Sequence, residues 1–171
     1  AGGHRLAVGQ HHVAAGEHVR VVLLDRVVQR LARGVPAAVV VDHVGRIIDA
    51  GASVLALGGD HFVAYPLLRA TAARHGTLSL IHFDAHSDTW DAGDELNHGT
   101  MFLRAARDGV IDPATSVQTG MRTPNESHGF NVIHADRFFD IGVQATIDEI
   151  RETVGDRPAY LWARADNPRA H

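Results

Sequence analysis

Histidine and aspartate side chains gather in two short stretches of this sequence. One ends in His61, after two glycines and an aspartate, and the other carries Asp84, His86 and Asp88 at every second position. Imidazole nitrogens and carboxylate oxygens together suit manganese, zinc or iron, whereas a calcium cage takes oxygen alone. If the backbone after residue 83 stays extended, the second stretch places its three side chains on one face. The spacing therefore predicts a divalent-metal site with four ligands: His61, Asp84, His86 and Asp88.

A simpler interpretation exists for each of these residues taken singly, because aspartate and histidine near a turn can cap a helix or face solvent. Two motifs that each follow an apolar run favour the metal site. Asp60 and His82 lie inside the motifs and are expected to orient the ligands by hydrogen bonds. The remaining internal histidines lack a partner at ligand spacing, so we expect structural or solvated roles for His43, His75, His128 and His134. Those near the start have irregular spacing and indicate a disordered terminus: His4, His11, His12 and His18.

Short apolar strands and amphipathic helices must position the ligands. Apolar runs predict strands over 53–57, 77–83, 116–121, 130–135 and 159–161, and helical spacing predicts helices over 37–50, 62–75, 101–107 and 147–154. Only a weak helical period is visible near residues 19–31. Strand 53–57 reads as buried on both faces, and with strand 77–83 it predicts a crossover unit of one parallel sheet. The alternation predicts an α/β fold with three layers, and ligands bind at the carboxyl ends of such strands.

Composition narrows the classes of protein further. The 171 residues fit one domain, and 45% hydrophobic with 21% charged residues is typical of a globular chain. A net charge of −4 with scattered arginines argues against nucleic acid as a partner. Cysteine is absent, which excludes a thiolate zinc site. No apolar run reaches the roughly 20 residues that cross a bilayer, and no secretory signal is visible, so we expect a cytoplasmic enzyme.

Three segments resemble the successive signatures of the ureohydrolase family, to which arginases and agmatinases belong. They are Gly58-Gly59-Asp60-His61, His82-Phe83-Asp84-Ala85-His86-Ser87-Asp88-Thr89 and Asn97-His98-Gly99-Thr100-Met101-Phe102. The His-Gly-Thr-Met-Phe form, the run from Asp60 to Arg69 and Ser116-Val117-Gln118 are more similar to agmatinases than to arginases. The resemblance covers residues 48–161 and implies a three-layer αβα arginase-like fold with a mainly parallel sheet, incomplete on its C-terminal side.

The resemblance also implies roles for single residues. Asp84 would bridge two Mn²⁺ ions, His61 and Asp88 would bind the first and His86 the second. Two adjacent cations lower the pKa of a shared water, and the resulting hydroxide would attack the guanidinium carbon of agmatine to give urea and putrescine, a polyamine. His98 would pass a proton to the leaving amine, as the pKa of histidine permits. The family resemblance further implies a homo-oligomer.

The sequence departs from the family at both ends, so we expect residues 1–171 to form a single partial ureohydrolase domain with a poorly matched segment over 1–36. Arg164 stands where the first aspartate of an Asp-x-Asp ligand pair is expected, and only Asp166 remains in register. A truncated or frameshifted coding sequence would give this pattern, and one ion in place of two would fit the remaining charge. Three alternatives stay open: a catalytically inactive metal-binding remnant, a guanidinobutyrase-type guanidino-acid hydrolase, and a mononuclear zinc hydrolase related to deacetylases of the same fold.

Overall fold

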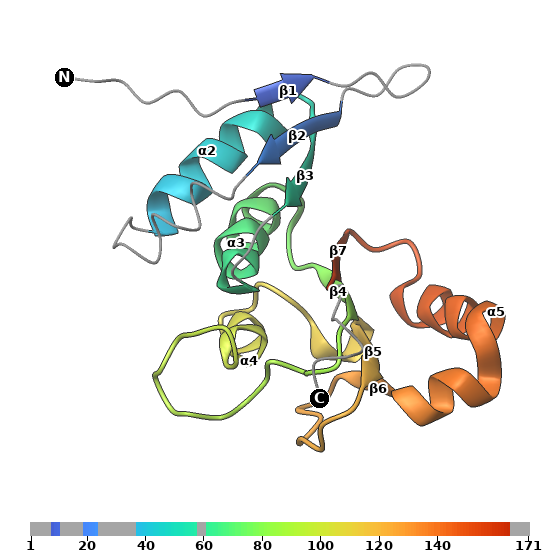
Figure 1. The fold of residues 1–171 in the computed structure, drawn as a ribbon. Helices are drawn as coiled ribbons and strands as arrows, with labels where there is room; N and C mark the ends of the chain where they lie inside the picture. Colours follow the sequence, from blue (N-terminus) through green and yellow to red (C-terminus); the bar gives the residue numbers. More distant parts are fainter. Residues whose placement is uncertain (1–7, 11–18, 24–36, 58–60, 165–171) are drawn as a thin grey trace. The chain divides into compact units, whose positions relative to one another are not determined.

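The computed structural model describes residues 8–10, 19–23, 37–57 and 61–164, and these form two compact units, residues 1–74 and 75–171. The expectation of a poorly matched, disordered start lies mostly outside the described residues, as do His4, His11, His12 and His18. Among the described residues, no helix has the length and apolar character needed to cross a membrane. Both units combine helices with a sheet, and the four-stranded sheet of the second unit is parallel throughout, so the predicted α/β fold class is confirmed (Figure 1).

The first unit contains a three-stranded sheet in the order β1-β2-β3. Strand β1 (Val8–Gln10) is antiparallel to β2 (Val19–Leu23), and β2 is parallel to β3 (Ser53–Leu57). Residues 19–23 are therefore a strand, and the weak helical period read there is wrong, because strand pairing overrides a weak local pattern.

Two helices of the first unit follow the predicted apolar spacing. Helix α2 (Ala37–Asp49) contacts β3 and buries Val40, Val44 and Ile47 along one stripe. A 3₁₀ turn η1 (His61–Val63) leads into α3 (Ala64–His75). The Arg74 guanidinium donates two hydrogen bonds to Asp49, at 3.0 and 2.9 Å, and so joins the ends of the two helices.

Strand β3 lies where the apolar run predicts it, but it is not buried on both faces. Leu55 and Leu57 are 47% and 51% exposed, while Val54 and Ala56 on the other face are half-buried. Within its own unit β3 pairs with β2, while β4 belongs to the sheet of the second unit. The crossover unit that the sequence predicts between these two strands therefore stays a prediction.

The second unit contains a parallel four-stranded sheet in the order β6-β5-β4-β7. Its strands are β4 (Ser79–Phe83), β5 (Val117–Met121), β6 (Asn131–His134) and β7 (Ala159–Ala163). Ser79 of β4 pairs with Ala159 of β7, and Ile81 pairs with Val117 of β5. Strand β4 therefore lies inside the sheet, between β5 and β7, and these two strands flank its carboxyl end.

Helices cover both faces of this sheet, as Figure 1 shows for α4 and α5. Helix α4 (Met101–Arg107) places Phe102 against the ring of His82, with 4.7 Å between ring centroids. On the opposite face, Ile150 and Val154 of α5 pack with Val117 and Ile133, and Ile81 and Phe83 of β4 border this cluster. A short 3₁₀ turn, η2 (Pro113–Thr115), precedes β5. Alternate residues of β4 thus face α4 and α5, which gives the second unit three layers.

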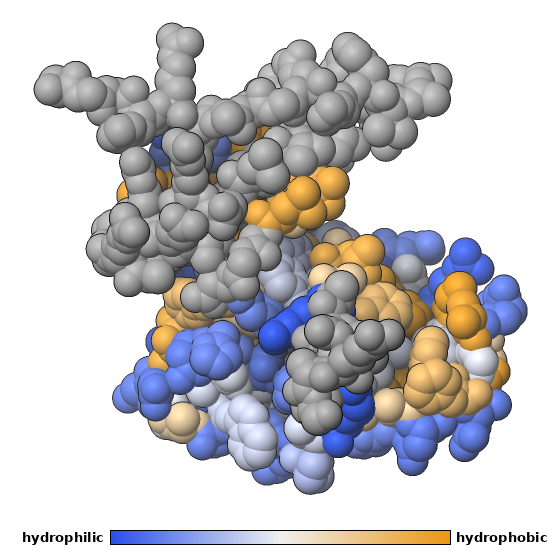
Figure 2. All heavy atoms as spheres, in the orientation of Figure 1, coloured by the Kyte–Doolittle hydropathy of each residue, from blue (hydrophilic) through white to orange (hydrophobic). Residues whose placement is uncertain are grey.

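Helix α5 (Ala135–Val154) is much longer than the predicted helix over 147–154. Its first half bends at Gly142, whose φ of 78° is outside the helical region. Phe139 and Val143 next to this bend are 80% and 63% exposed, and Figure 2 shows apolar and polar side chains interleaved on this side of the unit. The helix was missed because the glycine and the exposed apolar residues hide the helical period there.

Candidate metal centre

The chain turns immediately after β4, at Asp84. The Asp84 Oδ1 atom accepts hydrogen bonds from the backbone N–H of Ala85 at 2.6 Å and of His86 at 3.1 Å. An aspartate that accepts from the following amides fixes a local turn, so the backbone does not continue in extended form. The alternation of an extended strand, which was expected to place Asp84, His86 and Asp88 on one face, therefore ends at Asp84.

Three potential ligands nevertheless converge at this turn, and they are His82, Asp84 and Asp88. Their ligand atoms lie within 4.8 Å of one another, and all three residues are buried. Asp88 has a φ of 52°, in the left-handed region that aspartate tolerates better than most residues, and this returns its side chain toward Asp84. Two buried carboxylates this close repel each other, and a divalent cation would offset that repulsion. The donor set thus fits a metal ion.

His86 lies at the border of this group. Its side chain is 42% exposed, and its Nδ1 atom is 3.5 Å from Asp84 Oδ1. The turn at Asp84 directs this imidazole toward solvent while leaving it beside the carboxylate. The structure therefore brings Asp84 and Asp88 together as predicted, adds His82, and leaves His86 adjacent to one carboxylate oxygen.

His61 belongs to the first unit, where it begins η1 and is buried. Residues 58–60, which include Asp60, lie outside the described residues, so their predicted roles stay predictions. His61 therefore stays a predicted ligand, on the ground of its sequence motif.

The segment that carries Asp88 is held by a set of side-chain hydrogen bonds. Asn125 donates to the hydroxyls of Ser87 and Thr89, at 2.8 Å each, and Thr89 donates to Ser87 at 3.0 Å. The Asp88 carbonyl accepts from the backbone N–H of Phe102, at 3.1 Å, near the start of α4. These contacts fix a segment without regular structure, as an ordered site requires.

His98, the predicted proton donor, is exposed on a turn that is firmly anchored. Asn97 Oδ1 accepts from the Gly99 N–H at 2.8 Å, Thr100 donates to the Glu95 carbonyl at 2.8 Å, and the Trp90 N–H donates to the Gly99 carbonyl. His98 is outside the group of converging ligand atoms within the described chain. An exposed imidazole on a fixed turn can meet a substrate from solvent, and its role stays a prediction.

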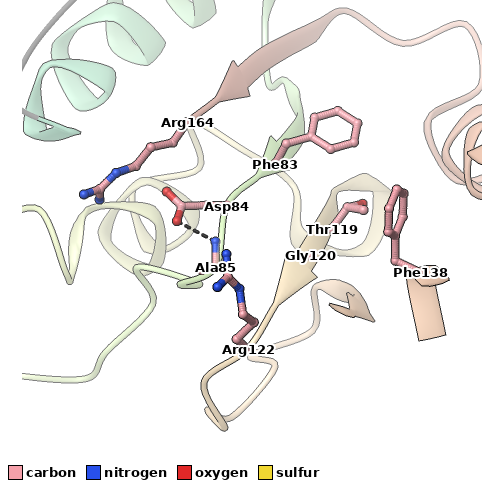
Figure 3. Close-up of a pocket in the computed structure, with 8 residues that line it drawn as sticks. All are labelled: Phe83, Asp84, Ala85, Thr119, Gly120, Arg122, Phe138 and Arg164. Carbon is pink, nitrogen blue, oxygen red and sulfur yellow. Dashed lines mark hydrogen bonds between the residues drawn. The ribbon is translucent and has the colours of Figure 1, made fainter. Parts of the chain in front are cut away.

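A pocket of about 310 Å³ opens beside Asp84, at the carboxyl ends of β4, β5 and β7 (Figure 3). Figure 3 shows the Asp84 carboxylate between the side chains of Arg122 and Arg164, with Phe83 and Phe138 on the side toward α5. This is the edge at which parallel sheets bind ligands. The lining combines one carboxylate, two guanidinium groups and aromatic rings, so the pocket can hold a small polar molecule that carries negative as well as positive charge.

Arg164 continues the ladder between β7 and β4, because its N–H donates to the Phe83 carbonyl at 3.0 Å. The resemblance expects a carboxylate ligand here, and a guanidinium cannot bind a cation. Asp166 lies outside the described residues. Within the described chain, this edge of the pocket therefore contributes a positive group where a second metal ion would need a negative one.

The four internal histidines expected to be structural or solvated stay outside the cluster. Within the described residues, the converging group does not include His43, His75, His128 or His134. His134 is the residue before α5, and His75 ends α3 in an exposed position.

One side chain that contacts this group was not predicted from the sequence, the amide of Gln118 in β5. Gln118 is only 1% exposed, and its Nε2 atom lies 3.2 Å from His82 Nδ1. A glutamine in the middle of the strand predicted over 116–121 was the available signal, since buried polar groups nearly always have a partner.

Taken together, parallel strands with carboxylate and imidazole groups at their carboxyl ends define an α/β protein with a metal-type site. Comparison with known proteins makes the class specific. The arginase family model matches residues 3–162. The agmatinase of Chromobacterium violaceum is 52% identical over 126 residues, which cover 71% of this chain and 39% of that protein.

Two solved structures agree with this match. The structure of a hypothetical agmatinase from Burkholderia thailandensis has a TM-score of 0.70 at 52% identity, covering 73% of this chain and 40% of that one. The proclavaminate amidino hydrolase of Streptomyces clavuligerus has a TM-score of 0.66 at 38% identity, covering 73% and 45%.

This chain belongs to the arginase family. It spans about two-fifths of the length of the agmatinase relatives that it matches.

Proposed function

We propose that this chain is the metal-site portion of an agmatinase-type ureohydrolase, which hydrolyses the guanidinium group of agmatine to urea and putrescine with Mn²⁺. The convergence of Asp84 and Asp88 at the end of β4 is the observation that carries the proposal. The high identity to agmatinases over this same region supports it.

In this proposal the two carboxylates and His86 hold the metal, and the sequence motif adds His61. A bound divalent ion would lower the pKa of water and supply the nucleophile. The backbone N–H groups of Ala85 and His86 donate to Asp84 Oδ1 and so hold this carboxylate in place. His98, on its anchored turn, is proposed to protonate the leaving amine. The charge at the pocket favours one bound metal ion over two, since Arg164 stands where the family resemblance expects a carboxylate ligand.

The experiment measures Mn²⁺ binding by calorimetry and urea release from agmatine by the manganese-loaded protein. Asp84→Asn removes the charge of the central ligand. Loss of a residue that only orients a ligand lowers metal affinity by about 10- to 100-fold, so Asp84→Asn should lower the Mn²⁺ affinity by more than this. His86→Ala should also weaken binding. His75→Ala, an exposed histidine at the end of α3, is the matched control and should change neither measurement. Wild-type affinity in Asp84→Asn would contradict the site.

A guanidino-acid hydrolase is the second candidate. Arg122 and Arg164 both line the pocket, and guanidinium groups bind carboxylates well. A substrate with a carboxylate tail, such as 4-guanidinobutyrate, would then be preferred to the cationic tail of agmatine. Urea release from the two substrates at equal concentration decides between them, and Arg122→Gln should lower the rate for the acid only.

A non-catalytic metal-binding remnant of the family is the third candidate. The guanidinium of Arg164 at the expected ligand position favours it. Mn²⁺ binding that depends on Asp84, without urea from either substrate, is its expected result. Association into a homo-oligomer belongs to the agmatinase proposal, and sedimentation velocity measures it.

A further inference from the structure

A buried chain of polar groups leads from the loop after β4 back to the Asp84 carboxylate. Its members are the Ser87 carbonyl, the Gln118 side-chain amide, the His82 ring and Asp84. Exposure is 0% for His82, 1% for Gln118, 5% for Ser87 and 6% for Asp84. In such an environment each donor must face an acceptor, because a mismatched buried pair costs about 1–3 kcal/mol.

The Ser87 carbonyl fixes which way the Gln118 amide points. The Gln118 Nε2 atom donates to the Ser87 carbonyl oxygen at 2.7 Å. In the reversed orientation the amide oxygen would face that carbonyl oxygen at the same distance, and two acceptors would repel. The amide nitrogen, which carries two protons and accepts none, therefore lies on this side.

The same nitrogen fixes the tautomer of His82. Gln118 Nε2 is 3.2 Å from His82 Nδ1, so Nδ1 must accept the second amide proton. The ring proton then lies on Nε2, which is 3.7 Å from Asp84 Oδ2. This distance is longer than a hydrogen bond, but it places the positive edge of the ring beside the carboxylate. The Phe102 ring, in edge contact with His82, limits rotation of the imidazole.

We infer that Gln118 makes His82 a positioning residue for Asp84 and excludes it as a metal ligand, although its nitrogens lie within the converging group. A protonated Nε2 has no lone pair for a metal, and the Nδ1 lone pair is used by Gln118. Binding through Nε2 would require Nδ1–H to face the amide protons. The statement about metal ligation rests on the proposed metal site, whereas the tautomer does not.

The decisive experiment is a long-range ¹H–¹⁵N correlation spectrum of the metal-free, ¹⁵N-histidine-labelled protein. His82 is assigned by its absence in His82→Gln. The expected spectrum has His82 Nδ1 at the shift of an unprotonated nitrogen and Nε2 at that of a protonated one. In Gln118→Met, which keeps the volume but removes the donor, this preference should disappear. A protonated Nδ1 in the wild type, or an unchanged tautomer in folded Gln118→Met, overturns the inference.

Mn²⁺ calorimetry tests the positioning role. His82→Leu should weaken binding by about tenfold, the lower range for residues that orient a ligand. His82→Gln should restore most of the affinity, because its amide N–H replaces the ring N–H beside Asp84. Loss in both variants as large as in Asp84→Asn would show that His82 is a ligand. If the wild type binds no Mn²⁺, the proposed metal site fails, and the tautomer measurement still decides the inference about Gln118.

Discussion

Contacts to the backbone of Asp84, as well as those to its carboxylate, hold this residue in position. Gly120 of β5 lies against it with a φ of 89°, and a Cβ atom at this position would be 3.2 Å from the Asp84 carbonyl oxygen. A glycine is therefore required here for two separate reasons, its backbone conformation and its lack of a side chain.

Gly120→Ala should lower the free energy of unfolding by about 2–3 kcal/mol, since positive φ costs about 1–2 kcal/mol and crowding adds to it. Gly76→Ala is the matched control, because Gly76 has a φ of 81° and nothing within 4 Å of a Cβ. Gly76→Ala should therefore lower the free energy of unfolding only by the cost of the positive φ. Urea denaturation followed by tryptophan fluorescence measures both, and equal losses would mean that the Asp84 contact is unimportant.

The site could be predicted from sequence only in part, and Asp84 and Asp88 show why. Their position after a buried strand is a sequence property, and the structure brings them together. The orientation of His86 depends on hydrogen bonds that Asp84 makes to the next two amides, which spacing alone does not reveal. Gln118 reaches the site from another strand, so its part depends on strand order.

At the scale of elements, the loop between β4 and α4 is anchored at Asp91 to the last turn of α4. Arg107, in the last turn of α4, donates to the Asp91 carboxylate at 2.6 and 3.2 Å, and the Gly93 N–H donates to it at 3.2 Å. The Arg107 hydrogen bond, with the Gly93 N–H second, lowers the pKa of Asp91 below its ordinary value near 3.8. The pair is exposed, so it orders the loop more than it stabilises the fold.

This lowered pKa gives the loop a defined acid dependence. Because the folded state binds the Asp91 proton more weakly than the unfolded chain does, the contribution is present above the ordinary pKa and is lost as pH falls through the lowered one. Arg107→Gln should raise the pKa of Asp91, measured by ¹³C NMR titration of the carboxyl. Asp94→Asn, which removes a carboxylate that acts on Arg107 only by charge, should move it far less. An unmoved Asp91 in Arg107→Gln would exclude the pair as the cause.

Most strands and helices follow from the sequence because each is short and strongly patterned. The helix over 101–107 and the strand over 53–57 have the expected bounds. The pairing of strands could not be predicted in the same way. Which strands neighbour β4 within its sheet depends on contacts between residues far apart in the chain, and the first half of α5 carries no clear period.

At the scale of the whole chain, the division into two compact units predicts two levels of stability. Amide hydrogen exchange at increasing urea should give one opening free energy for β3, whose Leu55 and Leu57 are exposed, and a larger one for β4, where Leu80 and His82 are fully buried. A single shared value for both strands would instead mean that the chain unfolds as one cooperative unit.

The pairing of Ser79 with Ala159 joins residues 80 positions apart, and this has a consequence for synthesis on the ribosome. At about 5–20 residues per second, β7 emerges roughly 4–16 s after β4. During that interval β4 can pair with β5 alone, and the backbone edge beside His82 and Asp84 is open to other extended chains. Strand β4, which carries the candidate metal centre, thus emerges early, and β7 covers its free edge late. The nascent chain is therefore most vulnerable to aggregation at the segment on which its chemistry depends.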